Sequence, residues 1–137
     1  MGEQRAGLVV GVQLRLFTTE EGGRKSGVSG EPYSYRPNWD VAGRKDPLSQ
    51  TGAPVLCLDR LWLHPGESTR AVLVPLSPEA WHAVGEGDRI YLYEGPRLCG
   101  DAVVTIIRPA FLPLSDDEEN SWRDWALGTL SAWESAR

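Results

Sequence analysis

Five side chains in this sequence have the types that a thiol-dependent enzyme would use: Cys57, Asp59, His64, His82 and Cys99. A cysteine attacks as a thiolate, and a histidine is the usual group that accepts its proton. Cys57 falls inside an apolar stretch, where a buried and inert thiol is usual. His64 precedes a proline in a turn and His82 follows a tryptophan near a helical turn, which indicates surface or packing roles. We therefore expect no catalytic residue.

The spacing of potential ligands does not favour a metal or a nucleotide. The sequence has no Cys-x-x-Cys pair and no His-x-x-x-His pair. It also lacks the Gly-x-x-x-x-Gly-Lys-Ser/Thr loop that cradles phosphates, and it leaves no room for a nucleotide-binding α/β domain. We expect no metal, no cofactor, no bound nucleotide and no GTPase activity.

Cations and aromatic side chains alternate in one stretch of the chain. Such a stretch suits the stacking of RNA bases, and it equally suits a protein interface, where arginine and aromatic residues dominate the binding energy. Only two lysines occur and four acids dilute the patch, so we favour the protein interface over RNA and over plain solvated loop charge. The cations and aromatics are Arg24, Lys25, Arg36, Arg44, Lys45, Tyr33, Tyr35 and Trp39, and the acids are Glu20, Glu21, Glu31 and Asp40.

Alternating apolar and polar residues predict the strands that must position these side chains. The clearest alternation covers residues 7–17, and residues 90–93 and 99–108 form a hairpin. Pro37 confines residues 33–39 to an edge or bulged strand, because proline has no N–H to donate. With further strands at 54–63 and 69–75, about six short strands without a βαβ rhythm predict an antiparallel barrel or sandwich.

The end of the chain predicts an amphipathic helix. Ser115 and Glu118 form a capping box, and acids in the first turn suit the positive end of the helix dipole. Gly128 weakens such a helix, so packing must hold it. We expect the stripe to cover its own domain, the alternative being the groove of a partner. The stripe consists of Trp122, Trp125, Ala126, Leu130 and Trp133.

The length and net charge of the chain are typical of a single globular domain. The chain has 137 residues, a formal net charge of −5 and 41% hydrophobic residues. Two cysteines suggest a reducing compartment, and neither a signal peptide nor a long apolar run is present, so we expect a cytoplasmic protein away from membranes. We divide the chain into an N-terminal arm (1–7), a β-barrel (8–110) and an acidic linker with the C-terminal helix (111–137).

Several short motifs occur in an order that resembles the C-terminal barrel domain of elongation factor Tu. The resemblance covers roughly residues 12–107 and departs from the family pattern at residues 25–27, at Asn38, where the family has Gln, and at residues 41–47. The matching motifs are Glu20-Glu21-Gly22-Gly23-Arg24, Tyr35-Arg36-Pro37, Pro65-Gly66-Glu67, and Arg89-Ile90-Tyr91-Leu92-Tyr93-Glu94-Gly95 followed by Arg97, Gly100 and Val103-Val104.

The resemblance implies an all-β fold, a six-stranded antiparallel barrel, to which the C-terminal α-helix is added. It also implies a tRNA-facing role for Tyr35, Arg36, Asn38, Gly95 and Arg97, with Arg24 in the loop after a strand. Because the GTPase switch is missing, the family's activity does not follow from the fold.

We therefore expect a stand-alone, non-catalytic binding module that presents residues 22–40 and 95–97 to a protein partner, as an accessory or protective factor. The alternative is binding of tRNA or another structured RNA through the same face, and a cysteine-dependent enzyme is the least favoured interpretation. The candidate binding residues are Arg24, Lys25, Tyr33, Tyr35, Arg36, Asn38, Trp39, Gly95 and Arg97.

Overall fold

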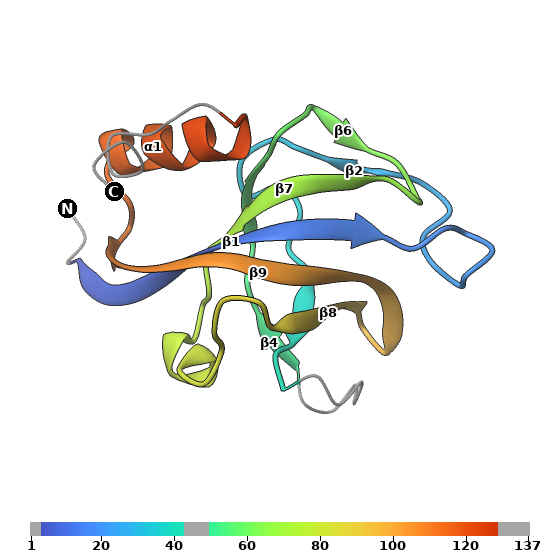
Figure 1. The fold of residues 1–137 in the computed structure, drawn as a ribbon, viewed down its shortest axis with the longest axis horizontal. Coiled ribbons are helices and arrows are strands. Elements are labelled where there is room, and N and C mark those ends of the chain that lie inside the picture. Colours follow the sequence, from blue (N-terminus) through green and yellow to red (C-terminus); the bar gives the residue numbers. More distant parts are fainter. Residues whose placement is uncertain (1–3, 43–49, 129–137) are drawn as a thin grey trace.

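The computed structural model describes residues 4–42 and 50–128 (Figure 1). These residues form short and long strands, one turn of 3₁₀ helix (η1) and one α-helix (α1). The elements are β1 (Arg5–Leu16), β2 (Val28–Ser29), β3 (Asn38–Asp40), β4 (Gln50–Gly52), β5 (Val55–Leu58), β6 (Trp62–Leu63), β7 (Ser68–Leu73), η1 (Pro78–Trp81), β8 (Arg89–Glu94), β9 (Arg97–Leu112) and α1 (Asp116–Ala126).

Seven strands form one antiparallel sheet in the order β4-β3-β8-β9-β1-β7-β5, and β2 and β6 form a separate pair. The all-β class and the C-terminal helix are confirmed. The closed six-stranded barrel is wrong, because this sheet has seven strands and no ladder joins its two edges among the described residues. The edge strands β4 and β5 are consecutive in the chain, separated only by Ala53 and Pro54. At this point the chain hydrogen-bonds to a segment outside the strands: the Val55 N–H donates to the Tyr35 carbonyl at 2.9 Å.

The central pair of strands is β1 and β9. Their register runs from Arg5 opposite Leu112 to Leu16 opposite Gly100, with an irregularity between Gly11 and Val12. β1 thus begins two residues before the predicted stretch 7–17 and ends one residue short of it, whereas β9 extends beyond both ends of the predicted stretch 99–108. This long pair forms the middle of the sheet, with β7 on the other side of β1 and β8 on the other side of β9.

One face of the sheet encloses the first apolar layer, which we call the inner layer. Side chains from nearly every strand meet there, and two tryptophans are its largest members. Close packing of this kind supplies most of the favourable free energy of folding. The inner layer consists of Val10, Val12, Leu14, Leu16, Val28, Trp39, Ala53, Val55, Leu58, Leu63, Ala71, Leu73, Trp81, Ile90, Leu92, Cys99, Ala102 and Val104.

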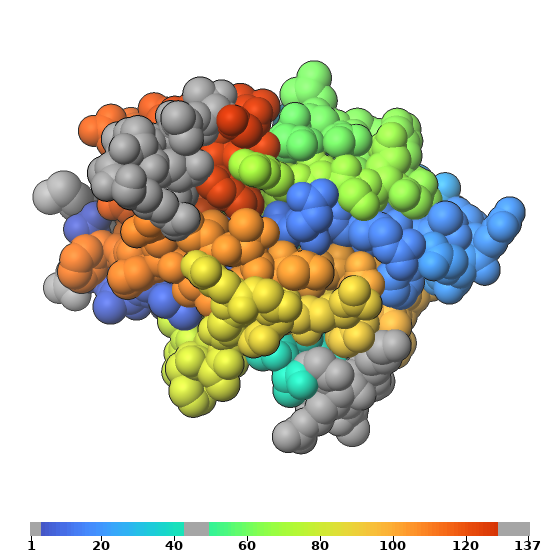
Figure 2. All heavy atoms as spheres, in the orientation of Figure 1, coloured from blue at the N-terminus to red at the C-terminus, as the bar shows by residue number. Residues whose placement is uncertain are grey.

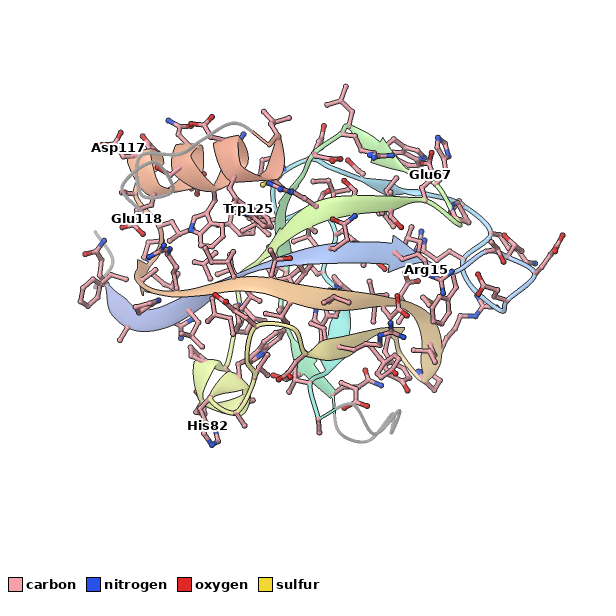
Figure 3. All side chains as sticks on the ribbon, viewed as in Figure 1. Arg15, Glu67, His82, Asp117, Glu118 and Trp125 are labelled. Carbon is pink, nitrogen blue, oxygen red and sulfur yellow. The ribbon has the colours of Figure 1, made fainter. Side chains whose placement is uncertain are left out.

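The other face of the sheet carries a second apolar layer, the outer layer, which α1 covers. In Figure 2 the red spheres of α1 lie against the yellow-green spheres of β7, and in Figure 3 Trp125 points from the helix toward the sheet. Trp122, Trp125 and Ala126 are buried, so the described part of the predicted stripe packs on its own domain. The outer layer consists of Val9, Leu56, Cys57, Val72, Val74, Ile106, Leu112, Leu114, Trp122, Trp125 and Ala126.

The two ends of α1 have clear local causes. The Ser115 hydroxyl accepts a hydrogen bond from the Glu118 N–H, as the predicted cap requires. Gly128 follows the helix with a φ of 79°, so it ends the helix and does not weaken its interior as predicted. Leu130 and Trp133, the remainder of the predicted stripe, lie outside the described residues. Nowhere in residues 4–42 and 50–128 is a helix both long and apolar enough to span a membrane.

Candidate interaction site

Glu94, at the end of β8, brings two of the predicted binding residues together. Its Oε2 atom accepts a hydrogen bond from the Arg24 guanidinium at 2.5 Å and another from the Tyr35 hydroxyl at 2.6 Å. The guanidinium also lies over the Tyr35 ring, 5.7 Å from its centroid. Residues far apart in the chain thus share one carboxylate oxygen, which fixes the segment 24–35 against the β8–β9 turn.

The protonation of this cluster follows from its surroundings. Partial burial opposes the charge on Arg24, but the hydrogen bond to Glu94 and the Coulombic attraction of that carboxylate, together with smaller contributions from Tyr35 and Cys99, outweigh this effect and raise the Arg24 pKa. Burial raises the pKa of Tyr35, and the hydrogen bond to Glu94 raises it further. Arg24 is therefore charged and Tyr35 neutral at physiological pH. Because Glu94 already compensates Arg24, this arginine is a structural cation and adds little positive charge to the surface.

The β8–β9 turn presents two further predicted residues, Gly95 and Arg97, and both are exposed. Gly95 has a φ of 60°, a conformation that residues with a Cβ rarely adopt. The Gln50 side chain donates a hydrogen bond from Nε2 to the Gly95 carbonyl at 2.8 Å, and this ties the turn to β4. The sequence offered no signal for Gln50, because nothing in its local pattern refers to residue 95.

Three more predicted residues lie exposed along the segment 25–38: Lys25, Arg36 and Asn38. The Arg36 Nε atom donates to the Tyr33 carbonyl at 3.1 Å, which holds the base of its side chain near the backbone. Asn38 begins β3, opposite Tyr93 of β8. Arg44 and Lys45, the other predicted cations, lie outside the described residues.

Two predicted aromatics do not join this surface. Trp39 is fully buried in the inner layer, and its indole N–H donates to the Ala53 carbonyl at 3.0 Å. The expectation that Trp39 contacts a partner is therefore wrong, because β3 pairs with β4 and β8 on its two sides and is not an edge strand. Tyr33 is half-buried against the outer layer, where burial and then nearby Glu119 raise its pKa.

The side chains with nucleophilic or acid–base chemistry are dispersed. Cys57 lines a groove beside α1, whereas His82 lines another hollow beside η1. Burial raises the pKa of Cys57 to about 12, so its thiol is protonated near neutral pH. Asp59 accepts hydrogen bonds from Thr69 and Arg60, which lower its pKa against the opposing effect of partial burial. Across the residues that the structure describes, no three side chains of His, Cys, Asp or Glu are grouped as metal ligands.

Comparison of the sequence with protein families and with curated proteins found no match. The resemblance to the C-terminal domain of elongation factor Tu thus stays a prediction from the motifs quoted above.

Proposed function

We propose that this protein is a non-catalytic binding module, similar in role to the barrel domain it resembles, which engages a protein partner as an accessory or protective factor. The surface that would make the contact is formed by Arg24, Lys25, Tyr35, Arg36, Asn38, Gly95 and Arg97, and we call it the partner face. The observation that carries the proposal is the carboxylate of Glu94, which Arg24 and Tyr35 share.

This network supports binding because it removes conformational freedom before a partner arrives. Immobilising a flexible side chain in an interface costs about 0.5–1.5 kcal/mol, and a loop costs more. The hydrogen bonds of Glu94 and Gln50 already hold the segment 24–35 and the β8–β9 turn in place. Lys25, Arg36 and Arg97 can then contact a partner from a rigid base, and arginine is frequent among residues that dominate binding energy.

The charge of the partner face favours a protein over a nucleic acid. Nucleic-acid affinity comes largely from cations that neutralise phosphates. Glu94 compensates Arg24 here, the chain carries a net charge of −5, and the exposed cations of the face are few. Binding of tRNA or another structured RNA remains the alternative, and the following experiment separates the two.

The test is capture of partners from a native lysate on the immobilised 137-residue chain, with and without ribonuclease. The double variant Arg36→Ala, Arg97→Ala should retain about tenfold less of the captured protein, and ribonuclease should change nothing. The matched control is Arg89→Ala, at the opposite end of β8, where the side chain is 60% exposed. Ribonuclease-sensitive capture that falls steeply with salt would establish the RNA alternative, and equal capture by both variants would exclude this face.

A further inference from the structure

A groove separate from the partner face lies between the end of α1 and the β5–β6 connection. The labels α1 and β6 near the top of Figure 1 mark the elements on its two sides. It has a volume of about 370 Å³, with Cys57 and Leu58 from β5 among its lining residues. Leu61 and Leu127 line it as well, and these side chains are 87% and 64% exposed. Two leucines left in water beside a hollow of this size indicate a surface that another molecule covers.

The charges on the groove are balanced. Asp59 and Arg60 already pair with each other at 2.9 Å. The other two charged lining residues are Glu31, which makes no ion pair within residues 4–42 and 50–128, and Arg123, whose one carboxylate contact is with Glu119 at 3.6 Å. The groove therefore has one carboxylate without an ion pair among the described residues, that of Glu31, and one guanidinium, that of Arg123, which can make further hydrogen bonds.

We infer that a second copy of this chain covers the groove through a two-fold contact. A two-fold interface needs a patch that complements itself, because the same surface occurs on both sides. This patch contains a projecting leucine, Leu61, and the hollow that receives it. It also contains both signs of charge, so that Arg123 of each copy faces Glu31 of the other. Each contact is then made twice.

Self-complementarity is what selects a second copy over an unrelated partner. A surface for a basic or an acidic partner would carry an excess of one charge, whereas the charges here cancel. The two chains repel each other at long range, since each carries −5, so the contact needs the apolar anchor and the crossed ion pairs to offset that repulsion. This inference is independent of the proposed function, because no residue of the partner face lines the groove.

Sedimentation equilibrium of the 137-residue chain, up to about 100 µM, tests the dimer. We expect a monomer–dimer equilibrium, and Leu61→Asp should weaken it at least about tenfold because a carboxylate would enter an apolar hollow. Leu61 is nearly fully exposed, so this change leaves folding intact. The matched control Phe111→Asp changes another exposed apolar residue, 61% exposed, and should leave the equilibrium unchanged. A chain that stays monomeric throughout this range overturns the inference, as does equal loss of the dimer in both variants.

Charge reversal tests the geometry. Outside the Asp59–Arg60 pair, Glu31→Arg leaves two cations at the groove and Arg123→Glu leaves two anions, so each variant alone should dimerise at least about tenfold more weakly than the wild type. An equal mixture of the two should form mixed dimers again, because every crossed pair is then of opposite charge. Failure of the mixture to associate, when each variant keeps the wild-type circular dichroism spectrum, would exclude the crossed pairing.

Discussion

The inner and outer layers lie on opposite faces of one sheet, yet they are assembled differently. The inner layer draws its side chains from strands spread along the chain from Val10 to Val104. The outer layer has a cover that comes from a single helix, which contributes Trp122, Trp125 and Ala126. Removing α1 would expose the outer layer only, whereas the inner layer opens only when the sheet itself comes apart. The two layers should therefore differ in how much stability is lost, and over how much of the molecule, when a buried side chain is truncated.

Their tryptophans are also held differently. The Trp39 indole is enclosed on all sides and donates a hydrogen bond to a neighbouring backbone carbonyl. Trp125 is held through Arg70, whose guanidinium lies 4.9 Å from the ring centroid and donates to the Trp125 carbonyl at 2.6 Å. The first contact depends on the whole sheet, and the second depends on one strand and one helix.

The largest effect should come from Trp39→Ala. We expect it to lower the free energy of unfolding by about 4–5 kcal/mol, because it leaves a large cavity in the inner layer and removes the donor to the Ala53 carbonyl. Urea denaturation followed by circular dichroism measures this loss. Phe111→Ala, at an exposed site, is the control and should change stability by no more than about 0.5 kcal/mol. Similar losses in the two variants would mean that Trp39 is not a core residue.

Trp125→Ala should cost less, about 3 kcal/mol, because the vacated space borders the surface and α1 can shift to fill part of it. The loss should also be local. Hydrogen exchange of the amides of α1 should accelerate strongly, while the amides of β1 and β9 should accelerate no more than the loss of global stability requires. Uniform acceleration throughout the sheet would show that both layers form one cooperative unit, and the distinction between them would fail.

The sequence revealed the elements better than their arrangement. Alternation predicted the strands around residues 7–17 and 90–108, and the helical stripe required something to pack on. Local patterns could not say that α1 lies over Gly11, because that contact joins residues more than a hundred positions apart. Nor could they show that the chain around Pro54 bonds to Tyr35 and Pro37, which leaves the sheet without a closing ladder. Tertiary contacts decided both points.

For the candidate site, spacing identified the segment and the turn but not the contact between them. Arg24 and Tyr35 were chosen as groups for a partner, yet the structure directs both to Glu94, 70 and 59 residues away. The prediction for Trp39 is wrong because Pro37, two residues before it, suggested an edge strand. Long-range ion pairs and the number of neighbours that a strand acquires are properties of the fold, and a single sequence carries no local signal for them.

Gly11→Ala sharpens the comparison from the strand side. A Cβ atom at Gly11 would lie 2.7 Å from Trp125 and 2.7 Å from Ile106, both members of the outer layer. We expect a loss of about 1–3 kcal/mol from this overpacking, again concentrated in α1. Tryptophan fluorescence should report a changed environment for the helix. The second variant, Gly11→Ala with Trp125→Phe, should recover part of the loss, and no recovery would place the strain elsewhere.

The smallest effect is expected from Ser115→Ala, and it gives the finest test. The variant loses the cap of α1, so the helix should be weaker by about 1 kcal/mol and should open about fivefold more often.

The two cysteines measure this opening. Cys57 belongs to the outer layer and Cys99 to the inner layer, so each thiol reports on one of them. Burial raises the pKa of Cys57 to about 12, so the native thiol is protonated at pH 8 and alkylation must proceed through opened molecules. In the opened state the thiol regains its ordinary pKa near 9, and labelling should therefore become faster as the pH rises toward that value. We expect Ser115→Ala to accelerate labelling of Cys57 about fivefold while that of Cys99 stays as in the wild type, as resolved by mass spectrometry of the alkylated peptides. If both cysteines react faster by the same factor, the helix and the sheet open together, and the two layers are energetically one.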